Sequence, residues 1–407
     1  MDLNDSPEQA AFRAECRAWL DANAPKDLLP MLEASSFGRS AIPPEDYVRV
    51  SREWQQKKAD AGWACLQWPK EYGGRGATPL EQIIWTQEEG IYGMLSSLFI
   101  IGHGMCGPTL IAYASEEQKR EFLPPLASGE KIWCQLFSEP GAGSDLAGIR
   151  TRAVRDGDDW VVNGQKVWTS GAQHSDWGIL VTRTDTDVPK HKGLTFFFLD
   201  MRSPGIEIRP IKQAAGDSGF NEVFFSNVRI PDSQRLGVVG DGWSVSLTTL
   251  MNERLAIGSG MSTGLPAVLE FAEEYRGGEM MQDSSVRDRV ADWYVNEAGL
   301  RYIGYRAITA LARGEMPGPE NSIGKVVAGN TMQAAADLAL DMQEQEGVLT
   351  ADSKFTAMLM RSLGTRIEGG TDEILKNIIA ERVLQLPGDI RVDRDVPFSE
   401  IPSGSAN

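Results

Sequence analysis

Apolar residues recur at helical spacing in the first part of the chain. Ser6 is a suitable N-cap, because its hydroxyl can accept a hydrogen bond from a free backbone N–H group, and Gln9 would complete a capping box. The next apolar residues follow one helix face: Phe12, Cys16, Trp19 and Leu20. Pro44 and Ser115 mark further helix starts. We therefore expect a helical region over residues 1–130.

The pattern changes near Lys131, where short runs of β-branched and aromatic residues replace the helical spacing. Turn residues separate these runs at short intervals, which is typical of a small barrel or sandwich. The runs are Trp160–Ser170, Trp177–Arg183, Leu194–Leu199, Ile206–Pro210 and Val223–Phe225. Asn163-Gly164 can take the positive φ angles of a type I′ turn, so the first run is predicted to be a hairpin. We expect a β region over residues 131–240.

A second helical region is predicted over residues 241–390, and Pro387-Gly388 closes it. On its first helix, Leu250 and Ile257 would share a face with Glu253. A carboxylate on an apolar face is costly unless it is paired or functional. From the residues alone, Glu253 is either a structural partner of a neighbouring cation or a functional group. Residues 391–407 are predicted to be a mobile tail.

Composition narrows the function classes. The chain has 407 residues, 42% hydrophobic and 24% charged, as expected for a globular protein of two or three domains. Its net charge of −17 argues against non-specific nucleic-acid binding, which needs basic patches. No apolar run approaches the roughly 20 residues that span a bilayer, and the N-terminus lacks the apolar core of a signal peptide. We expect no membrane association and a cytoplasmic location.

Cysteine and histidine usage argues against a metal site. The four cysteines are scattered without a C-x-x-C pair, which fits reduced, buried thiols. The three histidines are too few and too dispersed for metal ligation or for a histidine-based triad. We therefore predict no metal and no disulfide framework.

The stretch Cys134–Gly171 carries the candidate chemistry. Its first half is a short strand that runs into a glycine-rich turn, where Gly141 and Gly143 let a ligand approach the backbone closely. Backbone N–H groups and the hydroxyls of Ser138 and Ser144 suit a ligand rich in hydrogen-bond acceptors, and the second half adds an aromatic wall, Trp168. Either half alone is typical of an ordinary turn or hairpin, but the combination is more specific.

Together the halves resemble the acyl-CoA dehydrogenase family of flavoenzymes. In that family, T/S-E-P-x-A-G-S-D and a later N-G-x-K-x-W lie against the isoalloxazine of FAD; here they read S-E-P-G-A-G-S-D from Ser138 and N-G-Q-K-V-W from Asn163. The segments Ala61–Gly76, Ser115–Glu130 and Phe220–Pro231 also match family patterns. The resemblance covers nearly the whole chain. It implies an α+β fold: an N-terminal α-helical domain, a middle β-barrel and a C-terminal four-helix bundle within the ranges given above.

The resemblance implies an acyl-CoA thioester as substrate and FAD as cofactor. Family chemistry removes a Cα proton beside the thioester, transfers the Cβ hydride to flavin and gives the trans-2-enoyl-CoA. The positions matched to FAD contacts are Gln135, Leu136, Phe137, Ser138, Gly143, Ser144, Trp168, Thr169, Ser170, Thr371 and Glu373. The positions matched to substrate contacts are Ser144, Arg254, Gly369 and Gly370.

Two glutamates compete for the role of general base, which needs a dry site and a raised pKa. Many family members carry the base in I-Y-E-G-T. Aligned on Gly370-Thr371, that position is Gly369, and Glu368 is one residue off. The isovaleryl-CoA and long-chain members instead place the base in an E-R-L segment of the first helix after the barrel, which Glu253-Arg254-Leu255 matches. The resemblance therefore favours Glu253, with the Gly369 N–H donating to the thioester carbonyl.

Two family motifs are weak in this chain. The R-x-x-F-G segment that reaches the neighbouring subunit's FAD is replaced by Tyr275–Asp283, and Q-x-x-G-G-x-G is reduced to Gln343–Gly347. The family implies a homodimer or homotetramer, in which Arg276, Arg287 or Arg289 could approach the FAD pyrophosphate. The alternative is a heterotetramer with a related subunit, as in bacterial members that act on steroid side chains. The implied electron acceptor is an electron-transfer flavoprotein.

Other interpretations remain open at this level. Gly102–Gly107 is a literal G-x-G-x-x-G after an apolar run, which would suggest NAD binding, although Pro108 follows at once. A non-catalytic or FAD-sharing subunit would explain the weak adenine motifs, and the acyl-CoA oxidase and flavin monooxygenase branches share the fold. The acyl chain is undetermined, although Gly258, Ser259 and Gly260 suggest room for a bulky group.

Overall fold

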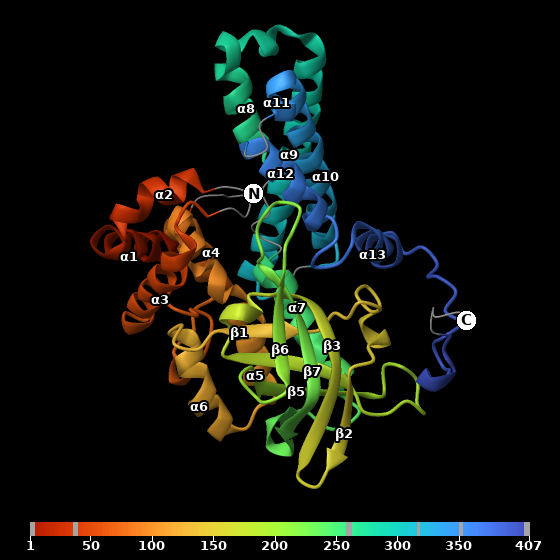
Figure 1. Cartoon of the computed structure of the whole chain (residues 1–407). Coiled ribbons are helices and arrows are strands. Elements are labelled where there is room, and N and C mark those ends of the chain that lie inside the picture. The colour runs from red at the N-terminus through yellow and green to blue at the C-terminus, as the bar shows by residue number, and fades with distance from the viewer. Residues whose placement is uncertain (1–4, 36–39, 258–262, 316–317, 350–352, 403–407) are drawn as a thin grey trace.

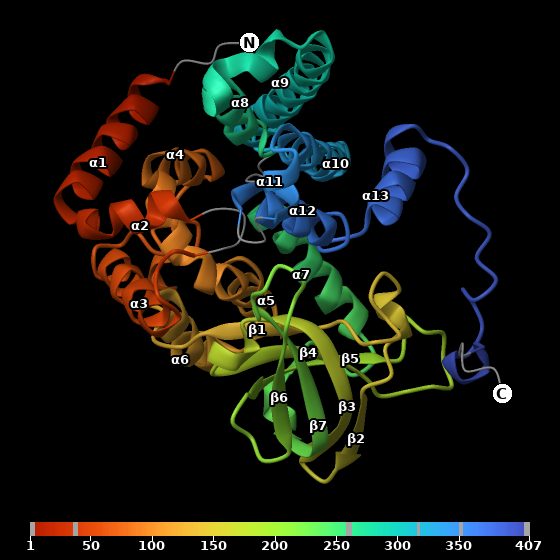
Figure 2. The ribbon, with the colours of Figure 1, turned by 45° about the horizontal axis from the view of Figure 1, so that its top comes forward.

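The computed structural model describes residues 5–35, 40–257, 263–315, 318–349 and 353–402 (Figure 1). Its helices and strands follow the predicted order of a helical, a β and a second helical region, which confirms the α+β architecture. The N-terminal helices lie beside a curved sheet, and a tall helical bundle stands above it (Figure 1). The long helix α7 (Gly242–Ile257) lies between the sheet and the bundle in both views (Figures 1 and 2).

The N-terminal region consists of α1 (Pro7–Asn23), α2 (Leu29–Ala34), α3 (Pro44–Asp60), α4 (Pro79–Glu89), α5 (Gly107–Tyr113) and α6 (Glu116–Ala127). The capping box at Ser6 is confirmed: Ser6 Oγ accepts from the Gln9 N–H at 3.3 Å, and Gln9 Oε1 accepts from the Ser6 N–H at 2.8 Å. The predicted helix starts at Pro44 and Ser115 are confirmed as well.

The segment Gly102–Gly107 is helical and leads directly into α5. A Cβ on Gly107 would lie 1.9 Å from a ring carbon of Trp68, and one on Gly102 would lie 2.7 Å from Leu126. These glycines therefore allow close packing of the helices. The interpretation of this segment as an NAD-binding turn is wrong, because that fingerprint requires a strand that leads into the turn.

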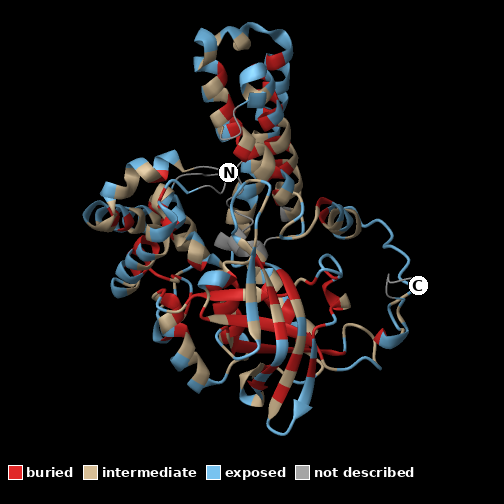
Figure 3. Cartoon of the chain, in the orientation of Figure 1, coloured by how far each residue is buried: buried red, intermediate tan, exposed pale blue. Residues whose placement is uncertain are grey.

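The β region forms one eight-stranded sheet in the order β6-β7-β3-β2-β4-β5-β8, with β1 paired in parallel to β4. Its strands are β1 (Trp133–Leu136), β2 (Arg152–Asp156), β3 (Asp159–Ser170), β4 (Trp177–Arg183), β5 (Leu194–Asp200), β6 (Ile206–Ile211), β7 (Phe220–Pro231) and β8 (Arg235–Leu236). Buried residues gather in this sheet and along the inner faces of the bundle (Figure 3).

The predicted hairpin at Asn163-Gly164 is wrong. Strand β3 runs through these residues, and the turn lies instead between the paired residues Asp156 and Asp159. Gly164 sits at a bulge of the β3–β7 pairing, and a Cβ there would lie 2.5 Å from the hydroxyl of Thr151. Its lack of a side chain thus serves a close approach of the backbone and not a turn.

The C-terminal helices after α7 are α8 (Leu265–Glu274), α9 (Ser284–Ala312), α10 (Asn321–Met342), α11 (Gln345–Leu349), α12 (Lys354–Thr365) and α13 (Asp372–Ile378). Four of them share one apolar core, to which α8 gives Val268, α9 Val290, α10 Ala335 and α12 Met358. Among the described residues no single helix is both long and apolar enough to cross a membrane; the bent pair Pro79–Phe99 and Gly102–Tyr113 meets that requirement only jointly, with a 75° bend.

The C-terminal tail is anchored on the β region at Phe398, whereas Val392 in the same tail is 85% exposed; the mobility of the tail stays a prediction. Phe398 is 4% exposed, and its ring lies 3.9 Å from the guanidinium carbon of Arg183 and 4.9 Å from that of Arg150. The Phe398 N–H donates to the carbonyl of Val188 at 2.9 Å. An aromatic side chain between two guanidinium groups gains cation–π attraction, and this contact anchors the tail.

Candidate active site

A buried ion pair holds the glycine-rich loop against strand β3. Lys166 donates to Glu139 Oε1 at 2.9 Å and to the Phe137 carbonyl at 2.8 Å, and the Lys166 side chain is fully buried. Glu139 also accepts from the backbone N–H groups of Arg150 and Thr151. Burial lowers the pKa of Lys166 to about 8, although Glu139 opposes this shift. Burial would raise the pKa of Glu139, but Lys166 and these hydrogen bonds lower it.

This pair explains why the two sequence motifs occur together. Glu139 belongs to the S-E-P-G-A-G-S-D segment and Lys166 to the N-G-Q-K-V-W segment, so one buried contact joins them. The Val167 N–H donates to the Ser138 carbonyl at 2.9 Å and adds a backbone link. No role was predicted for Glu139 or Lys166, although both stand in the motifs.

The end of β3 presents an aromatic face beside an unpartnered hydroxyl. Trp168 has a φ of +58° and is 57% exposed, which is unusual for so large an apolar side chain. Thr169 is 1% exposed, and within the described residues its Oγ1 has no hydrogen-bond partner. A flat, exposed ring next to a buried free hydroxyl fits a planar ligand with polar ring atoms, as the isoalloxazine of FAD is.

Other residues predicted to contact the flavin are placed differently. The side chains of Leu136 and Phe137 pack in the apolar cores of the sheet region, so only their backbone can face a ligand. Ser144 and Glu373 are exposed, and Thr371 caps α13 by accepting from the Ile374 N–H at 3.2 Å. Their contacts with FAD remain predictions.

Glu253 lies where helix α7 meets strand β1 and the loop between α12 and α13. Its Oε2 accepts from Gln135 Nε2 at 3.3 Å. A Cβ built on Gly369 would lie 3.6 Å from Glu253 Oε1. Three elements far apart in the sequence thus bring together a carboxylate, an amide and a glycine backbone. The prediction of Glu253 as the general base requires such an arrangement.

The loop at Gly369-Gly370 is a turn that only glycine adopts easily. Both residues have positive φ, +59° and +95°. The turn is held at its far end by buried Asp372, which accepts from Arg366 Nε at 2.8 Å and from Asn330 Nδ2 at 3.1 Å. These contacts hold the chain directly after the glycine turn, where it enters α13.

The competing glutamate has a different environment. Glu368 accepts a hydrogen bond from Arg361, and the side chains of both residues are about one-third exposed. Its carboxylate is thus committed to an ion pair in contact with solvent. Such a group is poorly suited to act as a general base in a dry site.

A lysine that no sequence motif marks also borders this site. Lys325 on α10 donates from Nζ to the Gly370 carbonyl. Burial lowers the pKa of Lys325; the carboxylates of Glu368, Asp372 and Glu253 oppose this shift, and Arg361 adds to it. No motif marks the residue, because its contact depends on how α10 packs on the loop.

Some predicted residues cannot be placed. The side chain of Arg254 and the residues Gly258, Ser259 and Gly260 lie outside the described part of the chain. Arg276 contacts Glu344 at 3.3 Å and lies 5.1 Å from the ring of Tyr275. The segment Tyr275–Gln282 joins α8 to α9 at the end of the bundle remote from the sheet (Figure 1).

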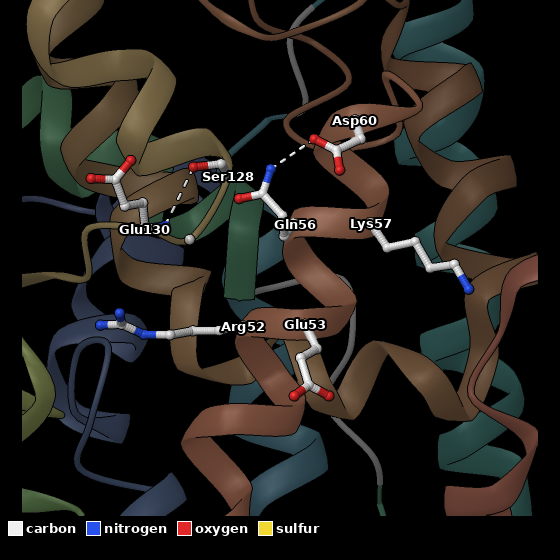
Figure 4. A pocket seen from close by; sticks show the side chains of 8 residues that line it. Arg52, Glu53, Gln56, Lys57, Asp60, Ser128 and Glu130 are labelled. Atoms are coloured by element: carbon white, nitrogen blue, oxygen red, sulfur yellow. Dashed lines mark hydrogen bonds between the residues drawn. The ribbon is translucent and has the colours of Figure 1, made fainter.

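A surface groove between α3 and the turn after α6 is separate from this site (Figure 4). It is lined by Arg52, Glu53, Gln56, Lys57, Asp60, Ser128, Gly129 and Glu130. None of these residues belongs to the glycine-rich loop, to α7 or to the Gly369-Gly370 turn.

Comparisons with known proteins identify the family to which this chain is similar. Family models for the N-terminal, middle and C-terminal domains of acyl-CoA dehydrogenase match residues 6–130, 134–228 and 240–384. Acyl-CoA dehydrogenase FadE34 of Mycobacterium tuberculosis is 39% identical over 360 residues, which are 88% of this chain and 49% of that protein. The chain thus spans about half the length of that relative. Acyl-CoA dehydrogenase IpdE1 of the same organism is 37% identical over 391 residues, 93% of this chain and 98% of that protein.

Solved structures of acyl-CoA dehydrogenases are similar to this chain over nearly its whole length. The Tcur3481–Tcur3483 steroid ACAD has a TM-score of 0.79 at 28% identity, and the match covers 96% of this chain and 100% of that one. The ChsE4–ChsE5 complex of Mycobacterium tuberculosis has a TM-score of 0.76 at 29% identity, with coverage of 96% and 100%. With family models matched in succession along the chain, these likenesses show that the protein belongs to the acyl-CoA dehydrogenase family of FAD-dependent oxidoreductases.

Proposed function

We propose that the protein catalyses α,β-dehydrogenation of an acyl-CoA thioester to the trans-2-enoyl-CoA, with Glu253 as the general base. The observation that carries this proposal is the position of the Glu253 carboxylate, whose Oε1 lies 3.6 Å from where a Cβ on Gly369 would stand and whose Oε2 accepts a hydrogen bond from Gln135. A base and a backbone hydrogen-bond donor on one side of a site are what removal of a thioester Cα proton requires.

Each residue has a defined task in this reaction. Glu253 accepts the Cα proton, and Gln135 orients its carboxylate. The Gly369 N–H donates to the thioester oxygen, on which negative charge develops as the proton leaves. Bound FAD supplies the acceptor for the Cβ hydride, and the residues that would hold it include Ser138, Trp168 and Thr169.

Two variants test the choice of base. Glu253→Gln should keep the fold and FAD but lower turnover by about 10²–10⁴-fold, because it removes the proton acceptor. Glu368→Gln, the matched control, should retain most activity. The assay is anaerobic bleaching of the flavin band by a panel of straight-chain, branched and steroid side-chain acyl-CoA thioesters. A more damaging effect of Glu368→Gln would overturn the assignment of Glu253, and a fully flavinated enzyme that no thioester bleaches would overturn the reaction.

We further propose a steroid side-chain thioester as substrate and a related subunit as partner. Two observations support this. The Tcur3481–Tcur3483 relative is a steroid ACAD, and both it and ChsE4–ChsE5 pair two different chains. In addition, Arg276 is already paired with Glu344, and Glu346 nearby adds negative charge unsuited to a pyrophosphate. The homo-oligomer favoured by the sequence remains the competing assembly.

The assembly is tested by expressing the chain alone and measuring its mass in solution and its FAD content. One tightly held FAD per chain in a homo-oligomer would refute the need for a partner. Apo or half-occupied protein that gains FAD upon co-expression with a related subunit would support the heteromer. We also propose an electron-transfer flavoprotein as the acceptor; failure of such a protein to reoxidise the substrate-reduced enzyme would exclude it.

A further inference from the structure

The end of strand β3 has a strained backbone. The register of the β3–β7 pairing shifts between Lys166 and Thr169, and Trp168 within this bulge has a φ of +58°. A left-handed backbone is uncommon for a residue other than glycine, and it is costly for one with so bulky a side chain. Such strain persists only where neighbouring groups hold it. The groups that hold Trp168 in this conformation therefore bear on the flavin site predicted there.

The side chain of Asn221 on β7 holds this bulge. Asn221 is 0% exposed and lies on the buried face of the strand, where a polar group is costly unless it is hydrogen-bonded. Its Nδ2 donates to the Thr169 carbonyl at 3.0 Å and to Gln173 Oε1. The amide thus ties the chain directly after Trp168 to the neighbouring strand.

The hydrogen-bond partners fix which way this amide points. Gln173 Nε2 donates to the Ser218 carbonyl at 3.2 Å, so the oxygen of Gln173 faces Asn221. Both groups that face Asn221 Nδ2 are therefore acceptors, and only a donor can satisfy them. Among the described residues, Asn221 Oδ1 has no hydrogen-bond partner. The side chain is thus held in place by what it donates, which an apolar residue of the same size could not replace.

The bulge leaves the Trp168 ring open to contact. The residue is 57% exposed, and its ring meets the ring of Phe220 edge-on, with centroids 6.0 Å apart and planes at 90°. The Gly171 N–H donates to the Gly219 carbonyl at 2.9 Å and holds the chain on the far side of the bulge. Strand β7 therefore supports both the backbone and the ring, while much of the ring surface stays available to a planar ligand.

We propose that Asn221 is a positioning residue for FAD: through the Thr169 carbonyl, it holds the left-handed backbone of Trp168 and so presents the indole ring to the isoalloxazine. Without the amide, the segment can relax to an unstrained backbone, and FAD binding must then restore the strained one. The apparent affinity falls in proportion to the fraction of protein that keeps the binding conformation. This inference rests on the proposed function in taking Trp168 as a flavin contact, and it does not depend on the choice of base.

The test uses the holoenzyme, with a related subunit if FAD binding requires one. Dilution releases FAD, and the rise in flavin fluorescence gives Kd; the visible circular dichroism of the bound flavin reports its surroundings. Asn221→Leu should raise Kd by about 5- to 100-fold, as expected when strain of this kind is no longer held. It should also change the flavin dichroism.

Glu222→Met is the matched control. Glu222 is the next residue of β7 and points to the opposite face, where it accepts from Gln165 Nε2 on β3 at 2.8 Å. The substitution weakens the same pair of strands but should leave Kd and the flavin dichroism unchanged. An equal loss of FAD affinity in Glu222→Met and Asn221→Leu would overturn the inference, because any weakening of the β3–β7 pairing would then suffice.

A double-variant cycle with Trp168→Leu makes the test specific. If Asn221 acts by placing the ring, Asn221→Leu should lower FAD affinity far less in the Trp168→Leu background than in the wild type. Additive losses, or wild-type Kd and dichroism in Asn221→Leu, would overturn the inference. If Asn221→Leu does not fold, the same cycle with Asn221→Ser, which removes the amide but leaves room for water, is decided by the same outcomes.

The two proposals fail in different ways. If Trp168→Leu alone keeps the wild-type Kd and dichroism, the ring is not a flavin contact, and the inference falls with that prediction. If Trp168→Leu weakens FAD binding but the cycle is additive, only the role of Asn221 is wrong. Neither result bears on Glu253, whose role is decided by the turnover of Glu253→Gln.

Discussion

Replacing Lys166 by Met tests whether one buried ion pair holds together the two segments that are predicted to bind the flavin. Lys166 is fully buried, and its ammonium group contacts Glu139 Oε1 at 2.9 Å and the Phe137 carbonyl at 2.8 Å. Removing one partner of a buried pair typically costs about 3–5 kcal/mol, because the other charge stays buried. Glu139 keeps its backbone donors at Arg150 and Thr151, so we expect the low end, about 3 kcal/mol.

The measurement is thermal unfolding followed by intrinsic fluorescence, with FAD content measured in parallel. A loss of about 3 kcal/mol corresponds to a fall in Tm of about 6–12 °C for a cooperatively unfolding unit of about 150–250 residues. FAD content should fall as well, because the pair fixes the loop that carries Ser138. Lys192→Met, which removes an exposed lysine, is the control and should change stability by less than about 0.5 kcal/mol.

The double variant Glu139→Gln with Lys166→Met makes the test specific. Because it leaves no unpaired charge, it should be more stable than Lys166→Met alone, and the two substitutions should not be additive. A Lys166→Met protein that unfolds within about 2 °C of wild type, or a double variant whose losses simply add, would refute the reasoning.

Three further outcomes follow from the structure. Gly369→Ala should lower the free energy of unfolding by about 1 kcal/mol, because φ is +59° there. It should also lower turnover, because the added methyl group would lie 3.6 Å from Glu253 Oε1. Unchanged kinetics would contradict this. Phe398→Ala should lower Tm and expose the tail to proteolysis, whereas Phe398→Trp should not; equal protease resistance in all three proteins would argue against the anchor. Asp232→Asn should lower the free energy of unfolding by about 1 kcal/mol at pH 7. The reason is that hydrogen bonds from Arg235 and Trp160 lower the pKa of Asp232 from 3.8 to about 2, while partial exposure of the side chain weakens the effect. That difference should be complete above pH 4 and vanish as the pH falls through 2, which urea unfolding at several pH values can check.

Local chemistry in the sequence predicted the element types well where it acts within a few residues. The capping box at Ser6 involves Gln9 three positions away, so no tertiary contact is needed to form it. The turn at Asn163-Gly164 was predicted on the same grounds and was wrong. There, pairing of β3 with β7 and the close approach of Thr151 outweigh the preference of the dipeptide for a turn.

Contacts between distant segments set the limit of the prediction. Phe398 is a single aromatic residue in a segment rich in proline and polar residues. No hydrophobic periodicity therefore predicts that its ring is buried against two arginines. Lys325 lies on a helix without a family motif, and only the packing of α10 against the loop gives it a partner. The family resemblance identified the segments that carry the chemistry, but not the residues that hold those segments in register.

The proposed position of the base on α7 goes together with the absence of a side chain at residue 369. Glu253 Oε1 lies 3.6 Å from where a Cβ on Gly369 would stand, so a side chain there would begin in contact with that carboxylate. A glutamate at 369 would also bring a second negative charge against the first, and two such carboxylates cannot both ionise easily. The electrostatic cost therefore favours a single base in the proposed site, on α7 or on the loop. In the proposed reaction, the loop at Gly369, with its left-handed backbone, would supply an N–H and the helix would supply the proton acceptor, Glu253.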